Sequence, residues 1–255
     1  MSSYEEVGFS LVNVVELIFS LLDGAEARSV AEVGAFRGEL SRKLLERGGR
    51  VTAIDPEPPA GLLKLAEDHP ELELVQETSH DALRHIPIPD VVILDGDHNY
   101  FTMEGELQII KERAQSFPLV MFHDVGWPLA RRDSYHAPER IPEDRRQPMN
   151  PDVGLAPEPS FEDPRPFART ADHEGGPGNG VLTAIEDFLA ERRDFRFALV
   201  PLFFGFGVMW REDARWAAAV ARIIEPWDRH PVLERVEANR VHHLLARAAQ
   251  ARQRS

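Results

Sequence analysis

The sequence predicts an α/β protein built on a doubly wound, seven-stranded and mostly parallel sheet. Short apolar segments alternate with helical patterns from residue 28 to 125, which is typical of strand–helix–strand units. The segments 90–95 and 118–122 are apolar almost throughout, as expected for strands that are covered on both faces. Two segments near 196–200 and 205–210 are close enough in sequence for a hairpin, which adds one antiparallel strand to the sheet.

A chain of 255 residues can bury a full core as one domain, and its elements are expected in a simple order. Residues 1–25 hold an amphipathic helix, because the apolar positions between Leu11 and Leu22 recur at helical spacing. Residues 181–255 complete the sheet and add the last helices. The remaining strands are expected at 30–33, 50–55 and 72–76, and the helices from near 38, at 58–67, after 78–81, and at 101–114, 181–193, 213–223 and 231–252.

Residues 126–180 break this alternation and are expected to form an insertion. They hold 10 of the 20 prolines and the run 175–180 of glycine, proline and asparagine, without convincing periodicity. A stretch of this length inside a compact domain is either a functional lid or a mobile insertion. Because it leaves from the carboxyl end of a strand, where open α/β sheets bind ligands, we expect a lid over the substrate. Five side chains in it are suited to gripping a polar ring: Trp127, Arg131, Arg132, Tyr135 and Phe167.

Composition narrows the class of protein. The formal charge of −14 argues against a large nucleic-acid surface, since a phosphate backbone would be repelled. The absence of cysteine excludes disulfides, thiolate metal sites and a cysteine nucleophile. The apolar segment 11–22 is too short to span a bilayer, and no charged start with a cleavage site suggests export, so a cytoplasmic protein without membrane contact is expected. The apolar first helix offers a face for a homodimer.

The turn between the first strand and the next helix predicts a cofactor site. The strand stops at Gly34 and the helix begins near Gly38, and glycines let a backbone approach a ligand closely. The helix also directs its free N–H groups into the same space. The second strand ends in Asp55, and an acidic residue there commonly binds the two hydroxyls of a ribose. Residues 28–125 are therefore expected to be a core that binds an adenosine cofactor, unless the glycines serve only helix–strand packing.

Glycine spacing decides which adenosine cofactor fits. A dinucleotide needs Gly-x-Gly-x-x-Gly, but Phe36 and Arg37 follow Gly34. Glu32 would repel a pyrophosphate and could hold an ammonium group. The pattern Glu32-x-Gly34-x-x-x-Gly38, followed by Asp55, resembles motifs I and II of the class I methyltransferases that use S-adenosylmethionine. The resemblance implies a Rossmann-like fold and cofactor contacts at Glu32, Gly34, Ala35, Phe36, Gly38, Asp55, Ser79, His80 and Asp95, although residues 78–81 also read as an ordinary helix cap.

Two polar clusters follow neighbouring strands. The fourth strand leads into Asp95-Gly-Asp97-His98, and the fifth leads into His123-Asp124. The tips of these strands are neighbours in a doubly wound sheet, so their carboxylates are crowded. Crowded carboxylates need a cation or must stay protonated, and oxygen ligands suit Mg²⁺ first, with Mn²⁺ or Ca²⁺ as alternatives. Otherwise the aspartates cap the following helices and the histidines are a polar rim.

The two clusters together extend the resemblance. The segment 95–100 with His123 and Asp124, after Glu32-Val-Gly34, resembles the metal-dependent O-methyltransferases of antibiotic and sugar biosynthesis, the macrocin O-methyltransferase type, over roughly residues 28–125. The resemblance implies that Mg²⁺ binds at Asp95, Asp124 and the position of His123, where histidine replaces a carboxylate. His123 is then a nitrogen ligand, or the metal is held more weakly, or His123 has another role.

Methyl transfer to a hydroxyl of a small molecule, a sugar or natural product, follows from this resemblance. A metal-bound hydroxyl is easier to deprotonate, and a base must remove its proton. His98 is the first candidate because its ordinary pKa is near neutrality, and Asp97 is the second. Alternatively His98 contacts the adenine or ribose and Asp97 is an anchor. Other functions left open are a nucleotide-dependent oxidoreductase or hydroxylase-like relative, and a binding protein that has lost turnover.

Overall fold

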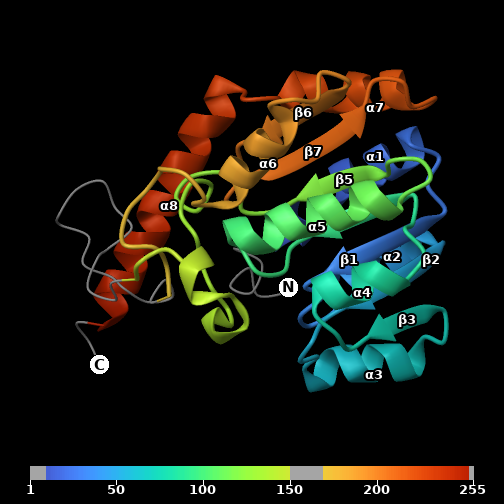
Figure 1. Ribbon diagram of the computed structural model, residues 1–255, viewed down its shortest axis with the longest axis horizontal. Helices are drawn as coiled ribbons and strands as arrows, with labels where there is room; N and C mark the ends of the chain where they lie inside the picture. The colour runs from blue at the N-terminus through green and yellow to red at the C-terminus, as the bar shows by residue number, and fades with distance from the viewer. Residues whose placement is uncertain (1–9, 150–168, 253–255) are drawn as a thin grey trace.

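The computed structural model describes residues 10–149 and 169–252, which form one seven-stranded sheet in the order β3-β2-β1-β4-β5-β7-β6 (Figure 1). Its strands are β1 (Ser29–Val33), β2 (Arg50–Ile54), β3 (Leu72–Val75), β4 (Val91–Leu94), β5 (Leu119–Phe122), β6 (Phe195–Val200) and β7 (Phe206–Arg211). Strand β7 pairs antiparallel with both β5 and β6, and the other pairs are parallel. The predicted doubly wound, Rossmann-like sheet with one antiparallel strand is confirmed.

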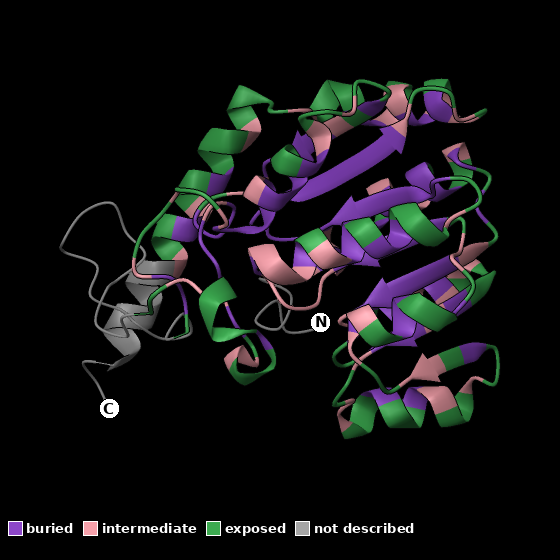
Figure 2. Ribbon diagram, in the orientation of Figure 1, coloured by how far each residue is buried: buried purple, intermediate pink, exposed green. Residues whose placement is uncertain are grey.

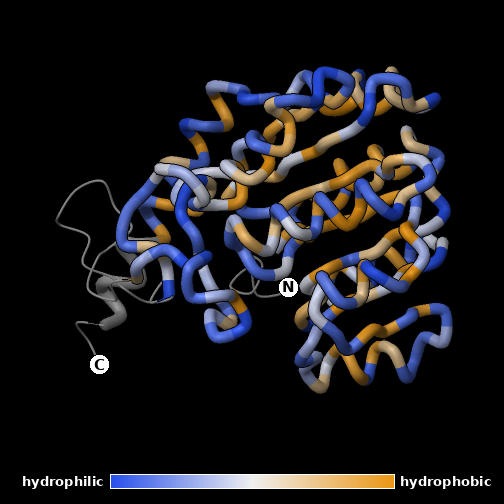
Figure 3. Tube along the Cα trace, viewed as in Figure 1, coloured by the Kyte–Doolittle hydropathy of each residue, from blue (hydrophilic) through white to orange (hydrophobic). Residues whose placement is uncertain are grey.

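Helices cover both faces of this sheet, so its central strands are buried (Figure 2). Along β4, Val91 and Ile93 pack into the core on one face, and Val92 and Leu94 into the core on the other, because successive side chains of a strand alternate. In Figure 3 apolar residues concentrate in the strands and in the helix faces turned toward them. The helices are α1 (Val15–Gly24), α2 (Glu39–Arg47), α3 (Ala60–Asp68) and α7 (Ala217–Ile224) on the first face, and α4 (Ser79–His85), α5 (Tyr100–Arg113) and α6 (Val181–Leu189) on the second.

Two of the helix boundaries that differ from the prediction have a clear physical cause. Helix α6 ends at Leu189 rather than near 193, since residues 191–194 are all charged and offer no apolar side to continue its buried face. Helix α7 begins at Ala217 rather than near 213, because the carboxylate of Asp213 binds the guanidinium of Arg211 in a turn after β7. Both corrections concern polar residues at the edge of the sheet and leave the topology unchanged.

The last helix, α8 (Pro231–Arg252), runs along the edge of the molecule and packs Val241 against Phe204, next to a partly buried ion pair. Glu237 accepts a hydrogen bond from the backbone N–H of Phe204 at 2.8 Å and pairs with Arg240 at 2.7 Å. This contact fixes the turn between β6 and β7. Within residues 10–149 and 169–252, no helix combines the length and the apolar character that crossing a bilayer requires.

The described parts of the insertion, residues 126–149 and 169–180, are folded, so the expectation of a structureless stretch is wrong there. They contain the short 3₁₀ helices η2 (Pro138–Arg140) and η3 (Glu143–Arg145). Two isolated β-bridges, between Ser134 and Thr170 and between Met149 and Ala171, tie the two described parts together. Prolines break regular periodicity without preventing packing, which is why the sequence pattern gave no helix or strand signal.

Asp133 holds the insertion to the rest of the protein. Its side chain is fully buried, and one carboxylate oxygen accepts the N–H groups of Tyr100 and Gly180, both at 2.7 Å. The other oxygen accepts the hydroxyl proton of Tyr135 at 2.7 Å. Tyr100 begins α5 and Gly180 precedes α6, so a single carboxylate satisfies backbone donors at the starts of two helices. Burial raises the pKa of Asp133, while these hydrogen bonds act in the opposite direction.

Candidate active site

A cavity of about 1090 Å³ opens at the carboxyl ends of the parallel strands. It is larger than the usual range of roughly 300–1,000 Å³ for a single small-molecule site, so it has room for a cofactor and a second ligand. Twelve of the thirteen predicted site residues line it: Glu32, Gly34, Ala35, Phe36, Asp55, Ser79, His80, Asp95, Asp97, His98, His123 and Asp124. The structure therefore brings the two predicted clusters and the predicted cofactor residues into one space.

Gly38 is the exception, because it does not line the cavity. It precedes α2 with a φ of +75°, and a Cβ there would come within 2.8 Å of Cδ2 of Leu65 on α3. Gly34 has a similar φ of +79°, and a Cβ there would lie 2.0 Å from the carbonyl oxygen of Asp95. Close packing against backbone therefore explains Gly34, whereas the positive φ explains Gly38, and only Gly34 also borders the cavity.

Asp55 is held in place by backbone donors. The N–H of Phe36 donates to Oδ2 at 3.0 Å, and the N–H of Glu57 donates to Oδ1 at 2.9 Å. Each carboxylate oxygen can accept a further hydrogen bond, so the side chain remains able to bind a pair of hydroxyls. Phe36 has a φ of +46° and a side chain that is 62% exposed at the cavity.

Glu32 lies deeper in the same half of the cavity and is almost fully buried. Its carboxyl group accepts a hydrogen bond from the hydroxyl of Ser41. Burial raises the pKa of Glu32 to about 8, and the charges of Asp95 and Asp55 add to the effect. Glu32 is therefore mostly protonated at neutral pH, and a cationic group placed beside it would favour the charged form.

Glu32 makes the stability of the fold depend on pH. The unfolded side chain loses its proton near pH 4.5, while the folded one keeps it to about pH 8, so unfolding releases a proton between these values. The free energy of unfolding should fall as pH rises through this window. Between pH 5 and pH 8 we expect the wild type to lose on the order of 3 kcal/mol of unfolding free energy through Glu32. Glu32→Gln should lack this loss, as measured by urea unfolding at both pH values.

The exposed Glu67→Gln is the matched control and should unfold like the wild type at both pH values. If Glu32→Gln kept the wild-type pH slope, Glu32 would not be protonated in the folded protein.

Ser79 and His80 lie on the side of the cavity expected for the adenine. The segment also holds the predicted helix cap. Thr78, which precedes Ser79, caps α4 because its hydroxyl accepts the N–H of Asp81. Nε2 of His80 lies 2.9 Å from the carbonyl oxygen of Thr102, and its ring meets the edge of Phe101 at 5.7 Å. A cap and a cavity wall thus coexist in one segment.

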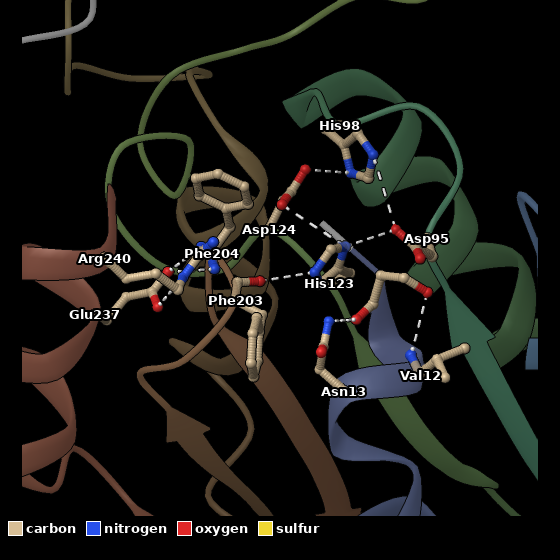
Figure 4. Close-up of polar contacts among 11 residues, drawn as sticks. Val12, Asn13, Asp95, His98, His123, Asp124, Phe203, Phe204, Glu237 and Arg240 are labelled. Carbon is tan, nitrogen blue, oxygen red and sulfur yellow. Dashed lines mark hydrogen bonds and ion pairs between the residues drawn. The ribbon is translucent and has the colours of Figure 1, made fainter. Parts of the chain in front are cut away.

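His123 is the centre of the second cluster (Figure 4). It is buried, with Nε2 2.7 Å from the carbonyl oxygen of Phe203 and Nδ1 2.9 Å from Oδ1 of Asp95. Nδ1 also lies 3.7 Å from Oδ1 of Asp124. Burial alone would lower the pKa of His123, but the charges of Asp95 and Asp124 outweigh it and raise the pKa to about 10.

His98 lies between the same two carboxylates (Figure 4). Its Nδ1 is 3.3 Å from Oδ2 of Asp124, whereas its Nε2 is 3.8 Å from Oδ1 of Asp95, beyond hydrogen-bond range. Asp124 has a φ of +57°, and its buried Oδ1 has no hydrogen-bond partner among the described residues. Such strained backbone is typical of functional sites. The geometry orients His98 through Nδ1 and leaves Nε2 available to a ligand.

Asp97 has a different task. Its Oδ1 accepts the backbone N–H of His136 at 2.8 Å, and the N–H of Ser134 donates to the carbonyl oxygen of His98 at 2.8 Å. These bonds attach the insertion to the loop after β4. They also bring the ring of His136 to 5.7 Å from that of His98, where burial and the charge of His98 lower the pKa of His136. No spacing in the sequence pointed to His136.

Four of the five side chains expected to grip a substrate ring lie among the described residues, and these four do not line the cavity. Arg131 pairs with Glu186 on α6, and the buried Arg132 donates to the carbonyl oxygen of Ala171. Tyr135 is bound to Asp133, Trp127 lies elsewhere on the surface, and Phe167 is outside the described residues. The insertion contributes other residues to the cavity: Leu129, Ser134, His136, Ala137, Glu139, Arg140, Ile141 and Arg169.

The predicted metal ligands Asp95, His123 and Asp124 do not fit a metal site as they are arranged. Among residues 10–149 and 169–252, no three or more histidine, aspartate or glutamate side chains are placed to hold a metal ion. The bond from Nε2 to the carbonyl of Phe203 is compatible with ligation through Nδ1, but Nδ1 is itself hydrogen-bonded to Asp95 and so has no free lone pair. The expected coordination of Mg²⁺ by His123 therefore finds no support in this geometry.

No protein-family model matches the chain, and no curated protein matches it in sequence. Solved structures with a similar arrangement include one from Staphylococcus aureus assigned to the caffeoyl-CoA O-methyltransferases, at a TM-score of 0.49 and 11% identity over 78% of this chain and 83% of that one. Two proteins assigned as O-methyltransferases follow. The one from Nostoc punctiforme has a TM-score of 0.48 and 15% identity over 78% and 56% of the chains. The one from Klebsiella pneumoniae has a TM-score of 0.47 and 12% identity over 79% of this chain and 80% of that one. Identities this low do not carry an activity over to this chain, so its function is argued below from its own residues.

Proposed function

We propose that the protein is an S-adenosylmethionine-dependent O-methyltransferase that acts on a hydroxyl of a small molecule, such as a sugar or natural product. One observation carries the proposal. A carboxylate suited to a ribose, Asp55, and an oriented histidine, His98, line the same cavity. The cavity has room for both a nucleoside cofactor and an acceptor.

The cofactor half of the cavity offers a contact for each part of S-adenosylmethionine. Asp55 would accept the ribose hydroxyls, and Glu32 would hold the ammonium group and give up its proton on doing so. Ser79, His80 and Phe101 would border the adenine. The bound cofactor would supply a methyl group on a positively charged sulfur.

The acceptor half supplies the base. Nδ1 of His98 lies 3.3 Å from Oδ2 of Asp124, so a proton on Nδ1 would face that carboxylate and the lone pair would lie on Nε2. The proton of the acceptor hydroxyl passes to Nε2 as the oxygen takes the methyl group, and Asp124 stabilises the imidazolium that forms. Asp97 is occupied by the backbone of His136 and acts as an anchor of the insertion rather than as the base.

The cofactor assignment is tested by calorimetric titration of S-adenosylhomocysteine into metal-stripped protein. We expect saturable binding that Asp55→Ala weakens by about 10- to 100-fold, because hydrogen bonds to a charged group are lost. Asp68→Ala, a surface aspartate paired with Lys64, is the control and should bind like the wild type. Asp55→Asn checks that the loss is not due to a collapsed turn at Phe36. Absence of binding by the wild type would remove the proposed function.

A further inference from the structure

Two carboxylates that would repel each other if both were charged follow the ends of β4 and β5. Asp95 and Asp124 both border the cavity and both lie within 4 Å of Nδ1 of His123, at 2.9 and 3.7 Å. Like charges this close are stable only if a cation lies between them or a proton is retained. The sequence alone pointed to a divalent metal for this purpose.

The hydrogen bonds of His123 supply that positive charge from within the chain. A backbone carbonyl can only accept, so the contact with Phe203 places a proton on Nε2. The contact between Nδ1 and Asp95 needs one more proton. Wherever that proton lies, on the imidazole or on the carboxyl group, the pair formed by His123 and Asp95 is neutral as a whole. The neutralisation therefore follows from the hydrogen-bond pattern.

We propose that His123 occupies the place of the divalent cation between Asp95 and Asp124, so that methyl transfer in this protein proceeds without a metal. The statement about methyl transfer rests on the proposed function. The statement about metal binding at Asp95 and Asp124 does not, and it can be tested by itself. His123 acts as a positioning residue: its Nδ1 lies 3.7 Å from Oδ1 of Asp124, whose Oδ2 lies 3.3 Å from Nδ1 of His98, the residue that meets the acceptor.

The surroundings of His123 hold its ring in this orientation. Phe203 and Phe204 have φ values of +51° and +64°, and Glu237 on α8 binds the N–H of Phe204, so the carbonyl that accepts from His123 is fixed. A metal at Nδ1 would leave the bond to this carbonyl in place, but it would have to displace the proton that His123 shares with Asp95 and so break that hydrogen bond.

Charge balance favours the same arrangement. With the pair of His123 and Asp95 neutral, only the charge of Asp124 remains beside the cavity. One negative charge matches one positive charge, either the imidazolium of His98 or the sulfur of the cofactor. A divalent ion added while the pair of His123 and Asp95 keeps its proton would give the site a net positive charge beside a cationic ligand.

Mn²⁺ titration followed by electron paramagnetic resonance tests the proposal on the wild type and on His123→Asp. We expect Mn²⁺ to show no saturable binding to the wild type. In His123→Asp, where three carboxylates converge, we expect saturable binding with an affinity at least about tenfold higher than the weak binding of the wild type. His123→Asn, which removes the imidazole without adding a carboxylate, is the matched control and should bind no tighter than the wild type. Turnover of the wild type should be unchanged by a chelator.

Saturable Mn²⁺ binding by the wild type that disappears in Asp95→Asn would overturn the proposal, and this result needs no folded variant at position 123. If wild-type protein fails to bind S-adenosylhomocysteine, the proposed function falls while the Mn²⁺ result still decides the metal question. A melting temperature of His123→Asp that rises on adding Mn²⁺ would independently support a created metal site.

Discussion

Replacing His98 by glutamine lowers turnover by about 10²- to 10⁴-fold, the usual contribution of a general base, while leaving cofactor affinity nearly unchanged. Glutamine keeps the size and polarity of the side chain but cannot take up a proton. Asp55 and Glu32, which are expected to hold the cofactor, belong to other strands and keep their contacts. The measurement is transfer of labelled methyl groups to hydroxyl acceptors found by screening phenols and sugars, with calorimetric titration of S-adenosylhomocysteine beside it.

His136→Gln is the matched control, because His136 lines the same cavity but has no carboxylate that orients its ring in the way Asp124 orients His98. We expect it to lose less than about tenfold in turnover. Equal losses in the two variants would assign the base to the pair of histidines rather than to His98. Full activity in His98→Gln would return the role to Asp97.

Replacing Asp133 by alanine lowers the free energy of unfolding by about 3–5 kcal/mol, because three buried donors lose one acceptor at the same time. For a chain of this size the melting temperature should fall by roughly 10 °C, measured by circular dichroism or calorimetry. Two of the three donors are backbone N–H groups at helix starts, which no side-chain rearrangement can supply with another partner easily.

Asp133→Asn should cost less than Asp133→Ala, since its carbonyl oxygen can still accept from Tyr100 and Gly180. The exposed Asp144→Ala, in the same insertion, should melt like the wild type. A melting temperature of Asp133→Ala within about 2 °C of that of Asp144→Ala would show that the insertion is not held by this carboxylate.

The sheet could be predicted because its signals are local. Apolar strands such as 118–122 and the hairpin near 196–210 can be recognised from a few consecutive residues. Parallel pairing then places the carboxyl ends of neighbouring strands such as β4 and β5 together. The same rule brought Asp95 and His123 into one cluster, 2.9 Å apart, without any knowledge of the side-chain positions.

The rest depends on partners that sequence patterns do not reveal. His136 reaches the cavity because its N–H binds Asp97, 39 residues earlier, and the role of His123 depends on a backbone carbonyl 80 residues later. Every residue has a backbone carbonyl, so the sequence does not indicate which carbonyl will accept a hydrogen bond from a given side chain. Gly38 shows the converse case: a motif position can be glycine because the backbone there has a φ of +75°, which side chains rarely allow, and not because it borders the cavity.

The bond between His123 and Phe203 has a consequence for the order in which the protein matures on the ribosome. At about 5–20 residues per second, the carbonyl of Phe203 is synthesised roughly 4–16 s after the histidine that needs it. Strands β1 to β5 can pair in that interval, and Asp55 already has its backbone donors from Phe36 and Glu57. A nascent chain would therefore form the proposed cofactor half of the cavity first, and the proposed acid–base half only when the last hairpin docks.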